Sequence, residues 1–210
     1  MDKRVNDTYG ARLRILLKDC KRFAFGQRPW GLANLGPESF VEWPRDLSSR
    51  RFIRIGSRSR IKSYASISGI DEYAGTRYRP RIEIGNDVYI GRYVYMTACQ
   101  EIVISDGCVL SEHIYISDST HGFDPQKGLI MKQKLESKGG VHIGPNCFLG
   151  YRVTITQGVE LGEWCIVGAH SVVTRSFPAY SMIAGAPARL LKLYSHELQQ
   201  WVEPTSLAEK

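Results

Sequence analysis

An aliphatic residue recurs at every sixth position in the second half of this chain, and this repeat restricts the chain to very few folds. The aliphatic side chains stand at positions 143, 149, 155, 161, 167 and 173, and glycine follows them at 144, 150, 162 and 168. Four positions after each aliphatic residue comes a small or apolar one: Cys147, Val153, Val159, Cys165 and Ser171. A fixed internal period of this kind is the signature of a repeat architecture.

A period of six fits neither the 3.6 residues of a helical turn nor the two-residue alternation of a half-buried strand. It fits a chain that forms a short strand, turns a corner where glycine tolerates unusual backbone angles, and repeats. Three such sides close one triangular coil, so residues 18 positions apart stack in a parallel ladder. The pattern therefore predicts a β-solenoid with a continuous ladder of buried aliphatic side chains.

The same pattern occurs earlier in the chain, with two interruptions. Aliphatic positions begin hexads at Ile55, Ile61 and Ile67, then at Ile84, Ile90 and Met96, and then at Ile104, Leu110 and Ile116. Residues 68–81 and 117–140 break the period, and we interpret them as loops ejected from the solenoid. Loops that leave a rigid scaffold commonly carry functional residues.

The sequence predicts a helix near each end of the chain. Residues 8–25 place apolar side chains at helical spacing among arginines and lysines, which is typical of a basic amphipathic helix. We expect it to pack on the solenoid or on a neighbouring subunit, and contact with an anionic membrane surface is the alternative. Residues 194–202 predict a short closing helix. The expected organisation is a helix and loop over 1–50, the solenoid over 51–192, and a helix and tail over 193–210.

The composition is that of a globular protein, with 43% hydrophobic and 23% charged residues and no apolar run as long as a membrane span. The polar N-terminal stretch lacks the core of a signal peptide, which predicts a cytoplasmic location. The net charge of +7 suits a polyanion such as a phosphorylated cofactor, and no nucleic-acid-binding motif accompanies it. The five cysteines show no CxxC spacing, and Cys108, Cys147 and Cys165 fall at the small inward hexad position, which favours buried core thiols for these three.

The hexads, together with the segment Ile183-Ala184-Gly185-Ala186-Pro187-Ala188-Arg189, resemble the hexapeptide-repeat acyltransferases, and in particular the O-acetyltransferases of sugars and polysaccharides. The resemblance covers roughly residues 50 to 192. It implies a mainly-β fold, the left-handed parallel β-helix, assembled as a homotrimer with acetyl-CoA as the acyl donor. The handedness comes from the resemblance alone, because parallel crossovers are otherwise right-handed.

His121 is the candidate for acid–base chemistry, since it stands near the start of the long loop. Transfer of an acyl group from a thioester to a hydroxyl or amine needs a base that removes the acceptor proton, and imidazole suits this role near neutral pH. In the sugar O-acetyltransferases that the chain resembles, the catalytic histidine lies at this point, so the resemblance implies this role for His121. Asp118 is the nearest carboxylate that could fix the imidazole tautomer, ahead of Glu112 and Asp124.

The resemblance also implies where coenzyme A binds. The family lays the pantetheine arm in the groove between adjacent subunits, against the last coils, at positions that correspond to Phe148, Gly150, Tyr151, Gly168 and Ala169. A backbone amide near Gly150 is expected to stabilise charge on the thioester oxygen. Positions associated with the adenine and the phosphates correspond to Thr174, Arg175, Arg189 and Lys192. Cations suit a polyphosphate, although plain solvated charge is the alternative for Arg175 and Lys192.

No metal site is expected, because the histidines at 113, 121 and 142 do not reproduce the His-x-x-x-x-His spacing of the related gamma-type carbonic anhydrases. The leading hypothesis is an acetyl-CoA-dependent O-acetyltransferase that acts on a sugar hydroxyl of a surface polysaccharide or its precursor, by direct transfer. N-acetylation of an amino sugar, nucleotide-linked, is the second hypothesis, and a non-catalytic scaffold is the third. The acceptor stays open, since Phe148 stands where galactoside and maltose acetyltransferases have tryptophan and residues 91–96 lack their asparagine.

Overall fold

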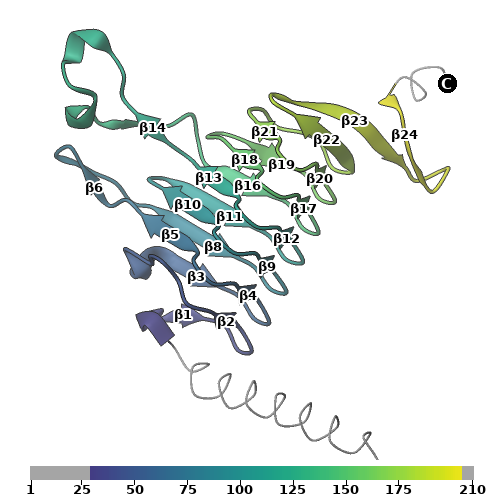
Figure 1. Cartoon of the computed structure of the whole chain (residues 1–210), viewed down its shortest axis with the longest axis horizontal. Coiled ribbons are helices and arrows are strands. Elements are labelled where there is room, and N and C mark those ends of the chain that lie inside the picture. The colour runs from purple at the N-terminus through teal and green to yellow at the C-terminus, as the bar shows by residue number, and fades with distance from the viewer. Residues whose placement is uncertain (1–28, 205–210) are drawn as a thin grey trace, which may run out of the picture.

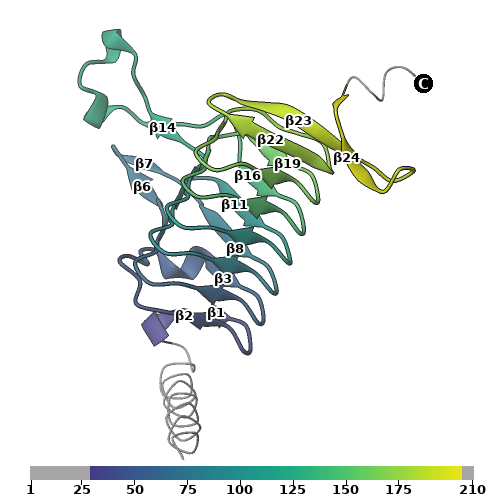
Figure 2. The same ribbon diagram turned by 45° about the vertical axis from the view of Figure 1, so that its right-hand side comes forward.

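The computed structural model describes residues 29–204, which form one parallel β-helix. Figures 1 and 2 show the strands stacked along one axis, so that each coil adds a short strand to each of three sheets. No helix within residues 29–204 is long and apolar enough to span a membrane. The helical segments that accompany these strands are single 3-10 turns: η1 (Pro29–Gly31), η2 (Arg50–Phe52), η3 (Pro125–Lys127) and η4 (Ile130–Lys132).

The three sheets form the three sides of the coil. The first sheet contains β1 (Asn34–Leu35), β3 (Ile53–Ile55), β8 (Arg81–Ile84), β11 (Glu101–Ile104), β16 (Val141–Ile143) and β19 (Glu160–Leu161). The second contains β2 (Phe40–Val41), β4 (Arg60–Ile61), β9 (Tyr89–Ile90), β12 (Val109–Leu110), β17 (Phe148–Leu149), β20 (Ile166–Val167), β22 (Ser181–Gly185), β23 (Ala188–Ser195) and β24 (Gln200–Val202). The third contains β5 (Ser66–Gly69), β10 (Tyr95–Ala98), β13 (Tyr115–Ser117), β18 (Thr154–Ile155) and β21 (Val172–Val173).

Strands of the last coils pair in parallel with the 18-residue offset that the hexads predict. The register joins Ile143 with Leu161, Leu149 with Val167, and Ile155 with Val173. The aliphatic residue of each hexad points inward, and all of these side chains belong to one buried cluster that runs the length of the helix. The predicted aliphatic ladder is therefore confirmed.

The cysteines of the hexads are core residues. Cys108, Cys147 and Cys165 are buried, and their thiols donate to backbone carbonyls at 3.1, 3.1 and 3.2 Å. Cys99 is also buried, and burial, with the charge of Asp118 beside it, raises the pKa of its thiol to about 11. A thiol that stays protonated at neutral pH is a poor nucleophile. The prediction of buried core thiols is confirmed for Cys108, Cys147 and Cys165.

The hexad glycines allow close approach between coils. A Cβ on Gly144 or Gly150 would lie 2.7 Å from a backbone nitrogen of the next coil, and one on Gly162 would lie 2.3 Å from the nitrogen of Ala179. The expectation that these glycines supply unusual corner angles is wrong, because none of them has a positive φ. Glycine is needed there because hydrogen-bonded coils leave little room for a side chain. The left-handed angles fall two residues later, on side-chain-bearing residues: Asn146, Arg152, Trp164 and His170.

The β-helix begins before the predicted boundary at residue 51. β1 pairs with β3 and β2 pairs with β4, so residues 34–41 already form two sides of the first coil. Leu35, Val41 and Leu47 continue the six-residue spacing, but Pro37 and Pro44 between them favoured a loop in the sequence. The basic helix predicted over residues 8–25 lies outside the described residues.

The helix predicted over residues 194–202 is wrong. These residues form the end of β23, a turn, and β24, which continue from β22 as an antiparallel meander on the second sheet. β22 is the last parallel strand of that sheet, and its outer edge would otherwise expose unpaired N–H and C=O groups. Residues 188–193 of β23 cover that edge, and β24 then pairs with the end of β23. This pairing outweighs the weak helical preference of so short a segment.

Gly162→Ala should destabilise the fold by about 1–3 kcal/mol, because the added methyl group forces two hydrogen-bonded coils apart. Urea unfolding followed by circular dichroism measures the change. Ser111→Ala is the matched control, since Ser111 occupies the same hexad position and already carries a Cβ. An unchanged unfolding midpoint for Gly162→Ala would show that close coil packing does not explain the glycine.

Candidate active site

Two segments leave the β-helix at the corner between its third and first sheets. The hairpin of β6 (Glu72–Tyr73) and β7 (Thr76–Arg77) follows β5, and the loop that contains β14 (Thr120–His121) and β15 (Leu135–Glu136) follows β13. Both segments project to the same side of the molecule (Figures 1 and 2). The two interruptions that the sequence predicts as ejected loops therefore emerge at one corner, one above the other.

The longer loop is closed by its own hydrogen bonds. At its neck, His121 pairs with Leu135 across β14 and β15, and the Gly122 N–H donates to the Lys134 carbonyl at 3.0 Å. Gln133 is buried inside the loop, where its amide nitrogen donates to the carbonyls of Asp124 and Gly128, each at 2.9 Å. The Gln133 side-chain oxygen also accepts from the Asp124 N–H at 3.0 Å. The loop is thus a braced structure.

Asp118 anchors the point where the loop leaves the coil. Its carboxylate is fully buried and accepts three backbone N–H groups, from Cys99 at 2.9 Å and from Gln100 and Glu101 at 2.7 Å each. The sequence predicts Asp118 as the partner of the His121 imidazole, and the structure corrects this assignment because both carboxylate oxygens hold the backbone of the preceding coil. No sequence signal pointed to those three amides, which lie 17 to 19 residues before Asp118.

His121 is exposed and lies against an aromatic side chain of the hairpin. The centres of the His121 and Tyr73 rings are 5.2 Å apart, and the ring planes are tilted by 57°. Among the residues that the structure describes, His121 makes no ion pair and no side-chain hydrogen bond. Its imidazole is therefore open to solvent, as a base that meets a bound acceptor must be.

A second histidine lies where the chain returns from the loop to the coil. The Nε2 atom of His142 is 2.7 Å from a carboxylate oxygen of Glu101, which also pairs with Arg81. Burial raises the pKa of the Glu101 carboxyl, but hydrogen bonds from His142 and Arg81 outweigh it and leave the pKa below its ordinary value. Because Asp118 holds the Glu101 backbone, this cluster ties both ends of the loop to one coil.

Five of the predicted coenzyme A residues lie together in adjacent coils. They occupy the second sheet and its corner with the third sheet: Phe148, Gly150, Tyr151, Gly168 and Ala169. Phe148 and Tyr151 are exposed, and the position that a Cβ on Gly150 would take lies 2.7 Å from the Ala169 nitrogen. The structure thus forms one surface from residues of two adjacent coils.

The N–H of Gly150 itself is not free to bind the thioester oxygen. It donates to the Val167 carbonyl at 2.8 Å, as part of the hydrogen bonding between coils. A single N–H that is already bonded within the helix is not available to an acyl oxygen. The repeat that predicts the position of Gly150 also predicts a parallel ladder, and that ladder uses this donor.

The four remaining candidates lie in different places. Arg189 in β23 pairs with Ala184, whose Cβ lies near Gly168, whereas Lys192 pairs with Met182 farther along β22. Thr174 and Arg175 follow β21, so they lie at the corner between the third and first sheets, across the third sheet from Gly168. The Arg175 guanidinium there lies 5.0 Å from the centre of the Phe177 ring. Only Arg189 is close to the surface that contains Gly168.

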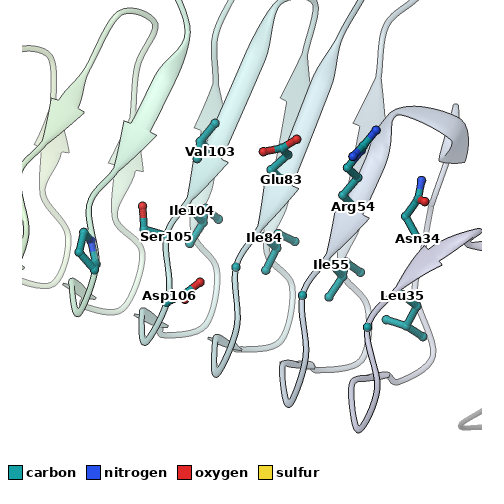
Figure 3. Close-up of a pocket in the computed structure, with 14 residues that line it drawn as sticks. Asn34, Leu35, Arg54, Ile55, Glu83, Ile84, Val103, Ile104, Ser105 and Asp106 are labelled. Carbon is teal, nitrogen blue, oxygen red and sulfur yellow. The ribbon is translucent and has the colours of Figure 1, made fainter.

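A groove of about 780 Å³ runs along the corner between the first and second sheets in the N-terminal coils. Figure 3 shows the side chains of Asn34, Arg54, Glu83 and Val103 in one row along it. None of the predicted site residues lines this groove. Gly36, Gly56 and Gly85 contribute no side chains at the corner, so we attribute the hollow to coil packing.

Residues 140–175 match the family model described as the bacterial transferase hexapeptide (six repeats). These residues therefore carry the hexapeptide repeat. A Mycobacterium tuberculosis protein named as a probable acetyltransferase is 29% identical over 142 residues, which cover 68% of this chain and 42% of that protein. WbbJ of Escherichia coli, provisionally named a lipopolysaccharide biosynthesis O-acetyl transferase, is 30% identical over 126 residues, 57% of this chain and 64% of WbbJ. The chain thus spans less than two thirds of either relative.

Solved structures of the same architecture align with most of the chain. The Bacillus cereus N-acyltransferase AntD, as a point mutant in complex with dTDP and coenzyme A, has a TM-score of 0.67 at 18% identity, over 91% of this chain and 93% of AntD. The Vibrio cholerae acetyltransferase VCA0836, which contains hexapeptide repeats, has a TM-score of 0.52 at 23% identity, over 84% and 81%. At these identities the likeness is one of fold, and the predicted left-handed parallel β-helix is confirmed.

Glu101→Gln should reduce thermal stability most clearly above pH 5. The depressed pKa of Glu101 means that its carboxylate stabilises the folded state above the ordinary value of 4.5, and that this contribution is lost as pH falls through the lower folded-state value. Melting temperatures of wild type and variant from pH 3 to 7 should therefore converge at the acidic end. A constant difference across this range would contradict the assigned role of the ionised carboxylate.

Proposed function

We propose that this protein is an acetyl-CoA-dependent O-acetyltransferase for a sugar hydroxyl of a surface polysaccharide or its precursor. The observation that carries the proposal is the exposed His121 imidazole, presented on a braced loop at the edge of a hexapeptide coil. The acetyltransferase names of both relatives support the reaction class, and the name of WbbJ supports a glycan acceptor.

The proposed reaction is a direct transfer with His121 as the general base. The imidazole nitrogen removes the proton of the acceptor hydroxyl as the oxygen attacks the thioester carbonyl of acetyl-CoA. The carbon–sulfur bond then breaks, and the imidazolium returns the proton to the coenzyme A thiolate. The products are an acetyl ester and free thiol. Asp118 takes no proton in this scheme and fixes the loop to the coil.

The donor surface has the chemistry that coenzyme A needs. Phe148 and Tyr151 offer exposed apolar area for the pantetheine arm, and Arg189 offers a cation near the same corner. Thr174, Arg175 and Lys192 are proposed for the nucleotide end of the cofactor. Neither coenzyme A nor the proposed acyl transfer requires a metal ion.

N-acylation of an amino sugar, nucleotide-linked, is the second candidate. AntD, whose fold matches over nearly the whole chain, is named an N-acyltransferase and was solved with dTDP. The same base and thioester serve an amine acceptor, so only the acceptor and product separate the two reactions. The third candidate, a non-catalytic scaffold, predicts neither turnover nor affinity for coenzyme A.

An aromatic face covers the outside of the second and third sheets and the corner between them. It is formed by Tyr64, Tyr89, Tyr93, Tyr95, Val109, His113, Tyr115, Phe148, Tyr151 and His170. Tyr64 and Tyr93 stack with ring centres 5.0 Å apart, and Tyr95 and Tyr115 stack at 5.5 Å with nearly parallel planes. Exposed apolar patches of this extent mark interaction surfaces.

We assign this aromatic face to contacts between three copies of the chain. In a single copy, the third sheet separates His121 at one corner from Phe148 and Tyr151 at the other. A neighbouring copy against the aromatic face would bring its own His121 loop toward this donor surface. A repeated contact of this kind closes a ring. The homotrimer that the sequence resemblance implies is thus part of the proposed site.

His121→Ala should lower acceptor-dependent thiol release from acetyl-CoA by about 10²- to 10⁴-fold, because the general base is removed. The assay uses a panel of sugars and nucleotide sugars, and mass spectrometry of the product assigns an ester or an amide. His196→Ala is the control, since His196 is exposed on the terminal meander far from the loop. Release that is unchanged in His121→Ala would remove the base assignment, and no release with any acceptor would favour the scaffold.

Replacing Tyr95 and Tyr115 together by glutamate should convert the trimer to monomers and abolish turnover, because two stacked rings at the centre of the aromatic face become charged. Size-exclusion chromatography with light scattering gives the mass, and circular dichroism checks the fold. Trp164→Glu, an exposed aromatic position at a different corner, should stay trimeric and active. A fully active monomer would contradict the shared site.

A further inference from the structure

The hairpin of β6 and β7 has no part in the proposed chemistry so far, yet it touches the loop that carries the base. We propose that Tyr73 is a positioning residue that holds the His121 imidazole in the orientation needed for proton removal. This inference rests on the proposed function, because positioning matters only if His121 is the base. The centre of the Tyr73 ring lies 5.2 Å from the centre of the His121 imidazole.

His121 needs an external support. It lies on a two-stranded ribbon outside the coil, its side chain is exposed, and no carboxylate among the described residues holds its ring. Asp118, the expected partner, is occupied by three backbone amides. A general base must meet the acceptor proton within hydrogen-bond reach, and a misplacement of 1 Å can cost about 10²-fold in rate. A freely turning imidazole would seldom have that geometry.

The hairpin contacts the loop at three points that differ in kind. Besides the ring contact with His121, the Tyr73 hydroxyl donates to the Met131 carbonyl at 3.1 Å near the tip of the loop. At the neck, the Leu135 N–H donates to the Tyr78 hydroxyl at 2.8 Å. Leu135 is the residue directly opposite His121 in the ribbon, so their side chains share one face. The hairpin therefore supports the loop on the His121 side.

These contacts separate two roles within Tyr73. The hydroxyl is committed to the Met131 carbonyl, so it is not a proton carrier for the reaction. The ring extends from β6 against His121, and it limits the directions in which the imidazole can turn. Aromatic pairs at this separation and tilt are attractive in their own right. The orienting group for the base is thus an aromatic ring where a carboxylate was expected.

Tyr73→Leu and Tyr73→Phe test the proposal in the full-length protein. Leucine removes the ring and should lower kcat about 10- to 100-fold with little change in the KM for acetyl-CoA, because the donor surface is elsewhere. Phenylalanine keeps the ring and should retain kcat within about threefold. Arg77→Ala is the matched control, since Arg77 lies on the same hairpin in a long, exposed pair with Glu72 and does not contact His121.

A measurement without substrate keeps the proposal separate from the proposed function. In protein labelled at histidine, the NMR signals of the His121 ring should move in Tyr73→Leu, where the ring current of Tyr73 is lost, and stay close to wild type in Tyr73→Phe and Arg77→Ala. Unmoved His121 signals in Tyr73→Leu, unchanged kcat in that variant, or a Phe variant as slow as the Leu variant would each overturn the inference. A different outcome is that the NMR signals move as expected but the wild type shows no turnover on any acceptor. This result would overturn the proposed function, and the contact between Tyr73 and His121 would then have no role in catalysis.

Discussion

The hydrogen-bonded stacking of one coil on the next is the constraint on which the rest of this structure depends. Successive strands pair in parallel, as Phe148 does with Ile166, and parallel strands lie about 4.8 Å apart. At that spacing a Cβ on Gly144 or Gly162 would meet the backbone of the neighbouring coil. The same ladder buries the aliphatic residues, uses the Gly150 amide, and sets outward residues above one another at fixed intervals.

Such a rigid body leaves the chemistry to the segments that it ejects. The coil determines the corner at which the hairpin and the long loop emerge, and Asp118 fixes the exit of the loop by holding three backbone amides. Gln133 then closes the loop from inside. The exposed imidazole of His121 is thus held by contacts outside the repeat, and a rigid support of this kind is what a positioned base requires.

The departures from the sequence-based predictions share a physical origin. The helix predicted over residues 194–202 is strand and turn because β23 covers the edge of the last parallel strand and β24 then pairs with β23, which a local pattern does not reveal. Asp118 was assigned to His121 because the two are close in sequence, whereas its real partners are amides of the preceding coil. The start of the β-helix near Asn34 was obscured by two prolines between Leu35, Val41 and Leu47. In each case a contact between distant segments outweighed a local signal.

The sequence by itself determined the architecture, the 18-residue register, the inward ladder, the buried thiols and the two ejected segments. It could do so because the same six-residue pattern of inward and outward side chains recurs in every coil. It also identified His121 as the candidate base, because its place in the long loop resembles that of the catalytic histidine in sugar O-acetyltransferases. Only the tertiary structure decided that Tyr73 lies against His121, that Asp118 anchors the loop, and that aromatic side chains from five coils form one face. The Tyr73 hydroxyl and the Met131 carbonyl are 58 residues apart, and their distance depends on how the ejected segments fold outside the repeat, where no period applies.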